Sequence, residues 1–382
     1  MRIGISCYAT HGGSGVVATE LGKHLAERGH EVAFISYAAP FRLGPIPSRV
    51  TVHEVEINEY PLLRNFPYTL ALASKMAEVV RDHRLDILHV HYAIPFGAAA
   101  LLARQITADL PLRIITTLHG TDITLVGNNS SFRPVTKMAI QASDAVTAVS
   151  SYLRAETIHQ FDITRPIEII PNFVDPEAPA PPPPCCLEEA LDDGTPVLVH
   201  ISNFRPVKRV SDVVRTFAAV RREIDAKLIL VGDGPDVSVA HHELERTGFL
   251  GDAFFVGVVR DVAPILKLAD VLLLPSQMES FGLAALEAMA VGVPVVASRV
   301  GGLPEVVEHD RSGFLEEPGD TAAMADRVIE IVTDRSVRTR MGDAARESAG
   351  RFHSDRVIPQ YEALYERVLR SSQRSATSDS SR

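Results

Sequence analysis

Short runs of β-branched and other apolar residues alternate with amphipathic segments along most of the chain. The first series of apolar runs reads RIGISCY, EVAFISY, VTVHEVEI, DILHVHY, RIITTLH, DAVTAVS and IEIIPN. Intervening segments such as VVATELGKHLAERG and YTLALASKMAEVVRDH repeat their apolar residues every three or four positions, which is typical of helices that pack one face against a core. The alternation therefore predicts parallel strands joined by helices that cover both faces of a sheet.

The alternation is interrupted once and then begins again. Residues 176–184 read PEAPAPPPP, and proline both removes backbone donors and favours extended geometry, so we predict a linker over 176–190. A second series of strand-like runs follows: PVLVHIS, AKLILVG, AFFVGV, DVLLLPS and PVVAS. We therefore predict an α/β chain of two doubly wound Rossmann-like domains facing a cleft, one over residues 1–175 and one over 191–350. A helix over 351–370 is expected to cross back to the first domain, and the small polar residues 371–382 are expected to form a flexible tail.

Composition limits the classes of partner. The net charge of −10 disfavours a general nucleic-acid or membrane-surface role, because either partner would meet a repelling field. Cys7 and the adjacent Cys185 and Cys186 form neither a disulfide framework nor a C-x-x-C motif for zinc or redox chemistry. No apolar run approaches the roughly 20 residues needed to cross a bilayer, and no signal-peptide pattern is present, so we expect a cytoplasmic protein.

A glycine-rich loop follows the first predicted strand. Gly13, Gly15 and Ala18 satisfy the dinucleotide pattern G-x-G-x-x-A at the start of a predicted helix. A nicotinamide enzyme would need an acidic residue at the end of the second strand, where Ser36 and Tyr37 stand instead. An NAD-dependent oxidoreductase therefore stays only a distant alternative. The helix N-terminus is predicted to bind a phosphate of another ligand.

Two carboxylates frame a second predicted phosphate site. In LPSQMESFGLAALEAMAVGVPVVAS, Glu279 precedes a predicted helix and Glu287 lies about one turn into it. Between them, the backbone N–H groups of Phe281, Gly282 and Leu283 lie at the helix N-terminus, which favours a pyrophosphate. The carboxylates are suited to accept hydrogen bonds from sugar hydroxyls. The pattern predicts a nucleotide that carries a sugar.

Across nearly its whole length apart from the tail, the sequence resembles retaining glycosyltransferases of family 4, which have the GT-B fold. The segments that carry the resemblance are SNFRPVKR, LVGDGP, the E-x7-E element and VGGLPEVV, in that order. The resemblance implies that Glu287 binds the nucleotide ribose and Glu279 the donor-sugar hydroxyls, while Arg205 and Lys208 neutralise the diphosphate. Paired cations suit this role because the departing diphosphate gains negative charge in the transition state.

The resemblance assigns further residues to the donor. His119, in TTLHGTD just past a predicted strand, corresponds to a histidine close to the transferred sugar. Gly232 and Gly234, in LVGDGP, correspond to a segment near the nucleotide base. Gly13 and Gly15 would let the backbone approach the donor phosphate. The resemblance implies no cofactor and no metal, which agrees with the absence of a D-x-D motif.

The first half resembles one branch of that family more closely. CYATHGGSGVVATELGK, LHVHYAIP, TLHGTDITLVG and SDAVTAVSSYL together imply transfer of N-acetylglucosamine from UDP-N-acetylglucosamine to the hydroxyl of L-malate, the first step of bacillithiol biosynthesis. A related transferase with another donor or with an acceptor such as an inositol phosphate stays open. The expected partners are these two substrates, and a homo-oligomer is also considered.

The sequence identifies the acceptor-binding residues less specifically than the donor-binding ones. Ser14, Tyr92, Thr117 and Thr121 lie on predicted strand ends or adjoining loops and are the predicted acceptor-binding residues. The candidate cations for the malate carboxylates are Arg64, Lys75, Arg133 and Lys137.

The sequence also bears on the mechanism. Asp122 is a candidate nucleophile for a covalent route, but a loop-acceptor role fits its position better. We therefore predict a front-face reaction in which the leaving phosphate takes the acceptor proton. His89 and His91 share one strand face without a third ligand, which favours a core or cleft-lining role over metal binding.

Overall fold

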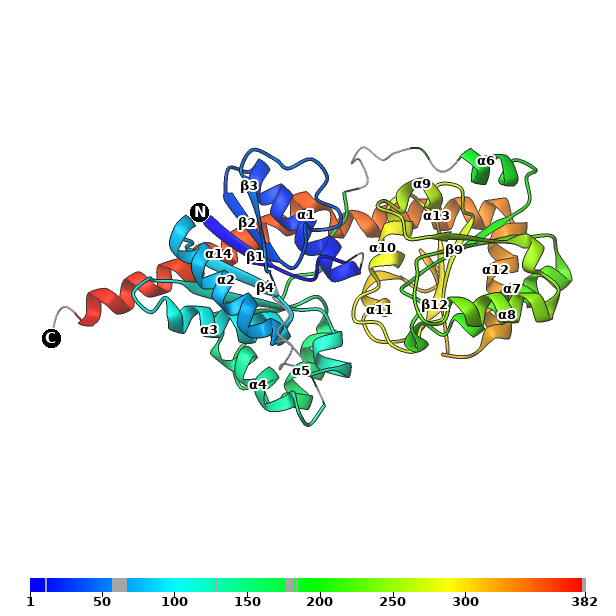
Figure 1. The fold of residues 1–382 in the computed structure, drawn as a ribbon. Helices are drawn as coiled ribbons and strands as arrows, with labels where there is room; N and C mark the ends of the chain where they lie inside the picture. Colours follow the sequence, from blue (N-terminus) through cyan, green and yellow to red (C-terminus); the bar gives the residue numbers. More distant parts are fainter. Residues whose placement is uncertain (11, 57–66, 128, 176–181, 183–184, 380–382) are drawn as a thin grey trace, which may run out of the picture. The chain divides into compact units, whose positions relative to one another are not determined.

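The structure is a computed structural model that divides into two compact units (Figure 1). It describes residues 1–10, 12–56, 67–127, 129–175, 182 and 185–379, and for 185, 186 and 372–379 it describes the backbone alone. Unit 1 comprises Met1–Asn172 and Ser354–Arg382, and unit 2 comprises Phe173–His353.

Unit 1 is built on a seven-stranded parallel sheet in the order β3-β2-β1-β4-β5-β6-β7. The strands are β1 (Arg2–Ser6), β2 (Glu31–Ser36), β3 (Val50–Glu54), β4 (Ile87–His91), β5 (Arg113–Leu118), β6 (Ala145–Ala148) and β7 (Glu168–Ile169). Nearly every residue of β1, β4 and β5 is buried, as expected for central strands covered on both faces. The order reverses between β1 and β4, which is where open α/β sheets bind ligands.

The helices of unit 1 connect these strands. They are α1 (Gly13–Glu27), α2 (Tyr68–His83), α3 (Ala98–Ile106), α4 (Arg133–Ala142), α5 (Ser151–Phe161) and α14 (Ser354–Asp379), with the short turns η1 (Ala93–Gly97) and η2 (Thr121–Leu125). In α1, the buried Val17, Leu21 and Leu25 recur at helical spacing and face the sheet.

Unit 2 contains a six-stranded parallel sheet in the order β10-β9-β8-β11-β12-β13. Its strands are β8 (Val197–Ile201), β9 (Lys227–Val231), β10 (Ala253–Gly257), β11 (Val271–Leu274), β12 (Val295–Ser298) and β13 (Gly313–Glu316). Its helices are α6 (Cys185–Leu191), η3 (Pro206–Lys208), α7 (Val210–Glu223), α8 (Val237–Thr247), η4 (Leu250–Asp252), α9 (Ala263–Leu266), α10 (Leu283–Ala290), α11 (Leu303–Val306), α12 (Thr321–Thr333), α13 (Arg335–Ala349) and η5 (Gly350–Phe352). One core cluster includes Phe217, Leu273 and Phe314. The predicted pair of parallel-sheet α/β domains is confirmed.

Two expectations about chain segments need correction. The segment predicted as a linker over 176–190 includes all of helix α6 except its last residue, because CCLEEAL contains neither proline nor glycine and is rich in good helix formers. The tail predicted over 371–382 is helical as far as Asp379, because no glycine or proline after Pro359 interrupts α14.

Helix α14 docks on unit 1 through both apolar and charged contacts. Figure 1 shows it, in orange to red, running along this unit. Tyr361 and Tyr365 are completely buried. At the edge of the contact, Glu362 accepts hydrogen bonds from Arg28 (Nε to Oε2, 3.0 Å) and is bonded to His30 (Nε2 to Oε1, 3.0 Å). The Arg28 guanidinium lowers the pKa of the Glu362 carboxyl below its ordinary value of 4.5.

Replacing Glu362 with glutamine is expected to lower the urea midpoint of unfolding at pH 7, by the equivalent of about 1 kcal/mol, because the ion pair is lost. Since the folded-state pKa is lowered, the carboxylate stabilises the fold above its ordinary pKa, and this contribution disappears as the pH falls through the folded-state value. The midpoint difference between the variant and the wild type should therefore shrink between pH 5 and pH 3.

Glu366→Gln on the same helix is the matched control. Glu366 pairs with Arg370 one turn away, and both side chains are largely exposed. The expected effect is below about 0.5 kcal/mol. An equal loss in the two variants, or a Glu362→Gln deficit that does not change with pH, would contradict the docking role of Glu362.

Candidate active site

The glycine loop of unit 1 packs directly against the end of β1. A Cβ atom at Gly15 would lie 2.5 Å from the Tyr8 carbonyl oxygen, so only glycine allows this approach of the helix to the loop. Gly13 is exposed and begins α1, and the first turn of this helix carries no acidic side chain. The N-terminus of α1 is therefore electrostatically suited to an anion.

Three of the four predicted acceptor residues come together around Tyr92. This residue follows β4 with a φ of 87°, a conformation that costs a non-glycine residue energy. Its hydroxyl interacts with the side chains of Ser14 and Thr121, and burial raises its pKa to about 12. The Tyr92 and Tyr8 ring centroids are 5.4 Å apart. Ser14, Tyr92 and Thr121, which follow β1, β4 and β5, thus form one cluster of neighbouring hydroxyl side chains.

The structure places Thr117, the fourth predicted acceptor residue, away from this cluster. Its side chain is completely buried, and its hydroxyl is bonded to His89 Nε2 (2.7 Å) and Thr147 Oγ1 (2.7 Å). The expectation fails because a residue near a strand end still points to one sheet face, and this face is covered by α14. Thr117 therefore belongs to the core of unit 1.

His119 lies immediately after β5, half-buried against two neighbouring rings. Its Nε2 is 2.8 Å from His91 Nδ1, and its ring centroid is 5.3 Å from that of Tyr92. Burial lowers the pKa of His119 to about 3, so the imidazole is neutral at physiological pH. A neutral imidazole offers one hydrogen-bond donor and one acceptor.

Asp122 fixes the backbone around His119. Its Oδ2 accepts from the backbone N–H of Ala93 (2.9 Å), and its Oδ1 accepts from that of Gly120 (3.0 Å). Burial raises its pKa to about 6 despite these bonds. Both carboxylate oxygens are occupied by backbone donors, so the geometry agrees with a loop-acceptor role rather than with a nucleophile.

In unit 2, the loops after β8 and β11 bring a cation and a carboxylate together. Lys208 Nζ is bonded to Glu279 Oε1, which also accepts a longer bond from Ser276 Oγ (3.3 Å). The two paired side chains are only 20% and 15% exposed. Arg205 begins the η3 turn and is exposed. Two of the residues predicted for the donor are therefore in contact.

The predicted helix N-terminus after Glu279 is present. Gly282 precedes α10 with a φ of 97°, and Leu283 begins that helix. The Phe281 side chain is buried against Phe352, with ring centroids 5.5 Å apart, so only its backbone is available to a ligand. Glu287 lies about one turn into α10 and is partly exposed.

Gly232 and Gly234 allow two loops of unit 2 to touch. Cβ atoms at these positions would lie 1.8 Å from the Ser202 carbonyl oxygen and 2.0 Å from that of Asn203. Both residues also have positive φ angles, 120° and 159°. The sequence predicted a ligand role for these glycines, and the structure adds a packing reason for them.

The candidate acceptor cations take ordinary surface positions where they are described. Lys75 pairs with Glu78 on α2, while Arg133 and Lys137 both lie near Asp162. Arg64 falls outside the described residues, as do the side chains of Cys185 and Cys186. Cys7 is buried, which raises its thiol pKa to about 12.

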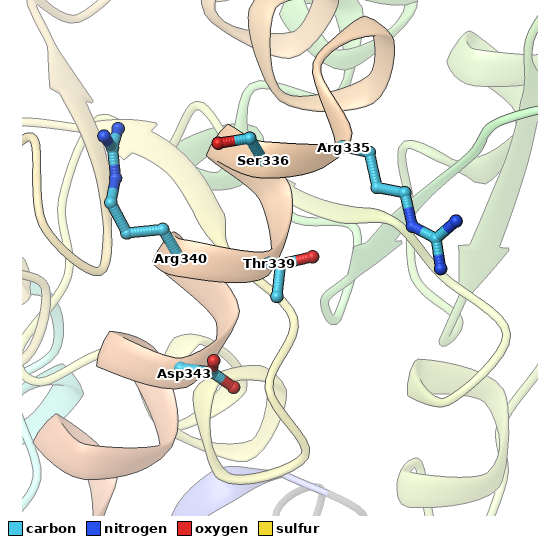
Figure 2. A pocket seen from close by; sticks show the side chains of 5 residues that line it. All are labelled: Arg335, Ser336, Thr339, Arg340 and Asp343. Carbon is cyan, nitrogen blue, oxygen red and sulfur yellow. The ribbon is translucent and has the colours of Figure 1, made fainter.

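A shallow depression of about 750 Å³ lies along α13 (Figure 2). Its lining residues are Arg335, Ser336, Thr339, Arg340 and Asp343. The two arginine side chains extend in opposite directions and form no convergent cation pair. None of the predicted site residues lines this depression, so it is not the predicted site.

Metal-binding clusters and membrane-spanning helices are both absent from the described residues. These residues contain no group of three or more His, Cys, Asp or Glu side chains arranged to hold a metal ion. In the same part of the chain, no helix has the length and apolar character needed to span a membrane.

Comparison with known proteins identifies the family. The model of Glycosyltransferase Family 4 matches residues 11–178, and that of Glycosyl transferases group 1 matches 188–348. The chain is 46% identical over 373 residues to N-acetyl-alpha-D-glucosaminyl L-malate synthase of Bacillus anthracis, covering 97% of this chain and 98% of the relative. It is 31% identical to a GDP-mannose-dependent alpha-(1-6)-phosphatidylinositol monomannoside mannosyltransferase of Mycobacterium tuberculosis, over 75% of this chain and 78% of that protein.

Solved structures agree on the fold. Anabaena HepE in complex with UDP-glucose has a TM-score of 0.80 at 22% identity, covering 96% of this chain and all of that one. Sucrose-phosphate synthase from Thermosynechococcus elongatus has a TM-score of 0.77 at 20% identity, over 97% of this chain. The predicted GT-B architecture is confirmed. With two matching family models and a near full-length relative at 46% identity, the chain belongs to glycosyltransferase family 4.

Proposed function

We propose that the protein transfers N-acetylglucosamine from UDP-N-acetylglucosamine to the hydroxyl of L-malate, with retention at the anomeric carbon, as the first step of bacillithiol biosynthesis. The observation that carries this proposal is the 46% identity to the Bacillus anthracis synthase over 97% of the chain. The clustering of Ser14, Tyr92 and Thr121 supports it, because neutral hydroxyls next to a helix N-terminus suit a small dicarboxylate.

Unit 2 supplies the donor site in this proposal. Arg205, Lys208 and the N-terminus of α10 neutralise the diphosphate, and Glu287 accepts hydrogen bonds from the ribose hydroxyls. Gly232 and Gly234 border the nucleotide base. Glu279, now paired with Lys208, binds donor-sugar hydroxyls once the diphosphate competes for the lysine. These fixed cations perform the charge neutralisation for which other transferases use a divalent ion, so we propose metal-independent catalysis.

Unit 1 supplies His119, which contacts the transferred sugar, and the acceptor residues around Tyr92. In a front-face reaction, the bond between the anomeric carbon and the β-phosphate oxygen breaks while a bond to the malate oxygen forms on the same side. The malate hydroxyl proton moves to the leaving phosphate oxygen, giving UDP and an α-linked product. The protein positions the reactants and stabilises the developing charge.

The defining experiment incubates the protein with UDP-N-acetylglucosamine and L-malate in the presence of a chelator. UDP release and an α-linked glucosaminyl malate, identified by mass and by anomeric coupling in NMR, are expected. A parallel reaction replaces malate with inositol 3-phosphate, the compound in the name of a D-inositol 3-phosphate glycosyltransferase that is 29% identical to this chain. Product with inositol phosphate but none with malate would replace the proposed acceptor and keep the transferase.

Lys208→Ala and Arg205→Ala are each expected to lower kcat on the order of 10²-fold, because these cations stabilise charge that develops in the transition state. Glu287→Ala should mainly raise the Kd for UDP, on the order of tenfold, since it binds the ribose. Steady-state kinetics and calorimetric titration with UDP separate the two effects. The exposed Arg222→Ala on α7 is the control and should match the wild type.

Asp122→Asn separates the front-face route from a covalent one. An asparagine turns an amide N–H₂ toward a backbone N–H, so turnover and the melting temperature should fall together. Mass spectrometry of quenched wild-type reactions should detect no glycosylated protein. A large loss of turnover with an unchanged melting temperature, together with a sugar adduct on Asp122, would instead establish a covalent intermediate.

A further inference from the structure

A stripe of buried polar side chains crosses the face of the unit 1 sheet that α14 covers. His89 and His91 on β4 lie on the same face as Thr117 on β5 and Thr147 on β6, and all four are completely buried. His89 is saturated: its Nδ1 is bonded to the Tyr365 hydroxyl (2.8 Å) and its Nε2 to Thr117 Oγ1 (2.7 Å). The stripe is therefore anchored by α14 at one end.

His91 lies between this anchored stripe and His119. Its ring centroid is 4.6 Å from that of His89 and 5.1 Å from that of His119. The rings of His91 and His119 are nearly parallel, with an angle of 22° between their planes. Its Nδ1 bonds to His119 Nε2 at 2.8 Å. Its Nε2 is buried and has no hydrogen-bond partner among the described residues. His91 is thus held on both sides and touches His119 through one nitrogen.

The bond between the two rings admits two arrangements of protons. Burial lowers the pKa of both imidazoles, so each ring is neutral and carries a single N–H. In one arrangement, His91 Nδ1–H donates to His119 Nε2, and the lone pair on His91 Nε2 is an acceptor without a donor. In the other, His119 donates, and a buried N–H on His91 Nε2 is left without an acceptor.

We propose that His91 is a positioning residue that donates from Nδ1 to His119 Nε2, thereby holding His119 as the Nδ1–H tautomer with a donor available to the transferred sugar. Buried N–H groups without acceptors are rarer in folded proteins than under-satisfied acceptors, which favours the first arrangement. His119 is half-buried, so its Nδ1–H can be satisfied by water or by a ligand. Among the described residues, no side chain bonds to that nitrogen.

This inference rests on the proposed function only for the identity of the group that His119 contacts. His119 is fixed in two ways, because Asp122 accepts from the neighbouring Gly120 backbone while His91 sets the plane and the protonation of the ring. A donor at Nδ1 can bond to a sugar hydroxyl or to oxygen that gains negative charge during transfer. The wrong tautomer would present a lone pair to the same atom.

The first test is a two-bond ¹H–¹⁵N spectrum of the full-length protein labelled at its histidines, in which the two neutral tautomers give different nitrogen shifts. The His119 signals are assigned by their loss in His119→Asn. We expect His119 to be the Nδ1–H tautomer in the wild type. An Nε2–H tautomer or an imidazolium at pH 7.5 would overturn the proposal, whatever substrate the enzyme uses.

Two substitutions at His91 test the positioning role. Asparagine places its amide N–H₂ close to the position of Nδ1 and can still donate, whereas leucine removes the bond. His91→Leu should release His119 into a tautomer mixture and lower kcat about tenfold, with the Kd for UDP unchanged because UDP lacks the transferred N-acetylglucosamine. His91→Asn should restore most of the activity and the wild-type tautomer.

His89→Leu is the matched control, since it removes an equally buried histidine that bonds to Tyr365 and Thr117 but not to His119. It should lower the melting temperature but change kcat less than about twofold. Equal losses of kcat at His89 and His91, or no rescue by asparagine, would reduce His91 to a packing role. If His119 is the Nδ1–H tautomer but the protein does not transfer N-acetylglucosamine to malate, the proposed substrate pair is rejected and the proposed role of His91 stands.

Discussion

The candidate residues of unit 1 and those of unit 2 both depend on the parallel alignment of the strands. Parallel strands bring their carboxyl ends to one edge of a sheet, so loops that are far apart in sequence meet there. In unit 1 this edge carries Gly15, Tyr92 and His119, and in unit 2 it carries Lys208 and Glu279. The central strands are almost entirely buried, which confines solvent-accessible polar groups to the segments that follow them. Reversal of one central strand would carry the loop that follows it to the opposite edge of its sheet.

Paired polar groups hold these loops in shape. Asp122 joins the loops after β4 and β5, and the Gln277 N–H donates to the Val207 carbonyl between the loops after β11 and β8 (2.8 Å). The Lys208–Glu279 pair adds charge compensation, since an isolated ammonium or carboxylate so little exposed would be costly. In the proposed function, a diphosphate would meet a cation that is already held in place, and its binding would release the Glu279 carboxylate for sugar hydroxyls.

Most of the fold could be predicted from the sequence because hydrophobic periodicity encodes it locally. The positions of Ser14, Tyr92 and Thr121 just beyond strand ends could be predicted from the sequence, and in the structure these three residues are neighbours. Their role in binding an acceptor stays a prediction. Helix α6 and the end of α14 were misjudged because proline content and small polar residues describe composition, whereas helix continuity depends on the absence of breakers. The contact between Lys208 and Glu279 was not predicted, because two residues 71 positions apart leave no local pattern that would indicate their contact.

The faces of central strands could not be predicted in the same way. Alternation places His89 and His91 on one face but does not say what covers it, and the covering Tyr365 is 276 residues away from His89 in sequence. The same lack of information made Thr117 look available to a ligand. Burying histidine, threonine and tyrosine side chains costs desolvation that leucine and valine would avoid, so this polar stripe is an inefficient way to stabilise a sheet. We infer that the stripe serves to orient His119. Tyr365 of α14 bonds to His89, the His89 ring packs against that of His91, and the bond from His91 places the His119 proton on Nδ1.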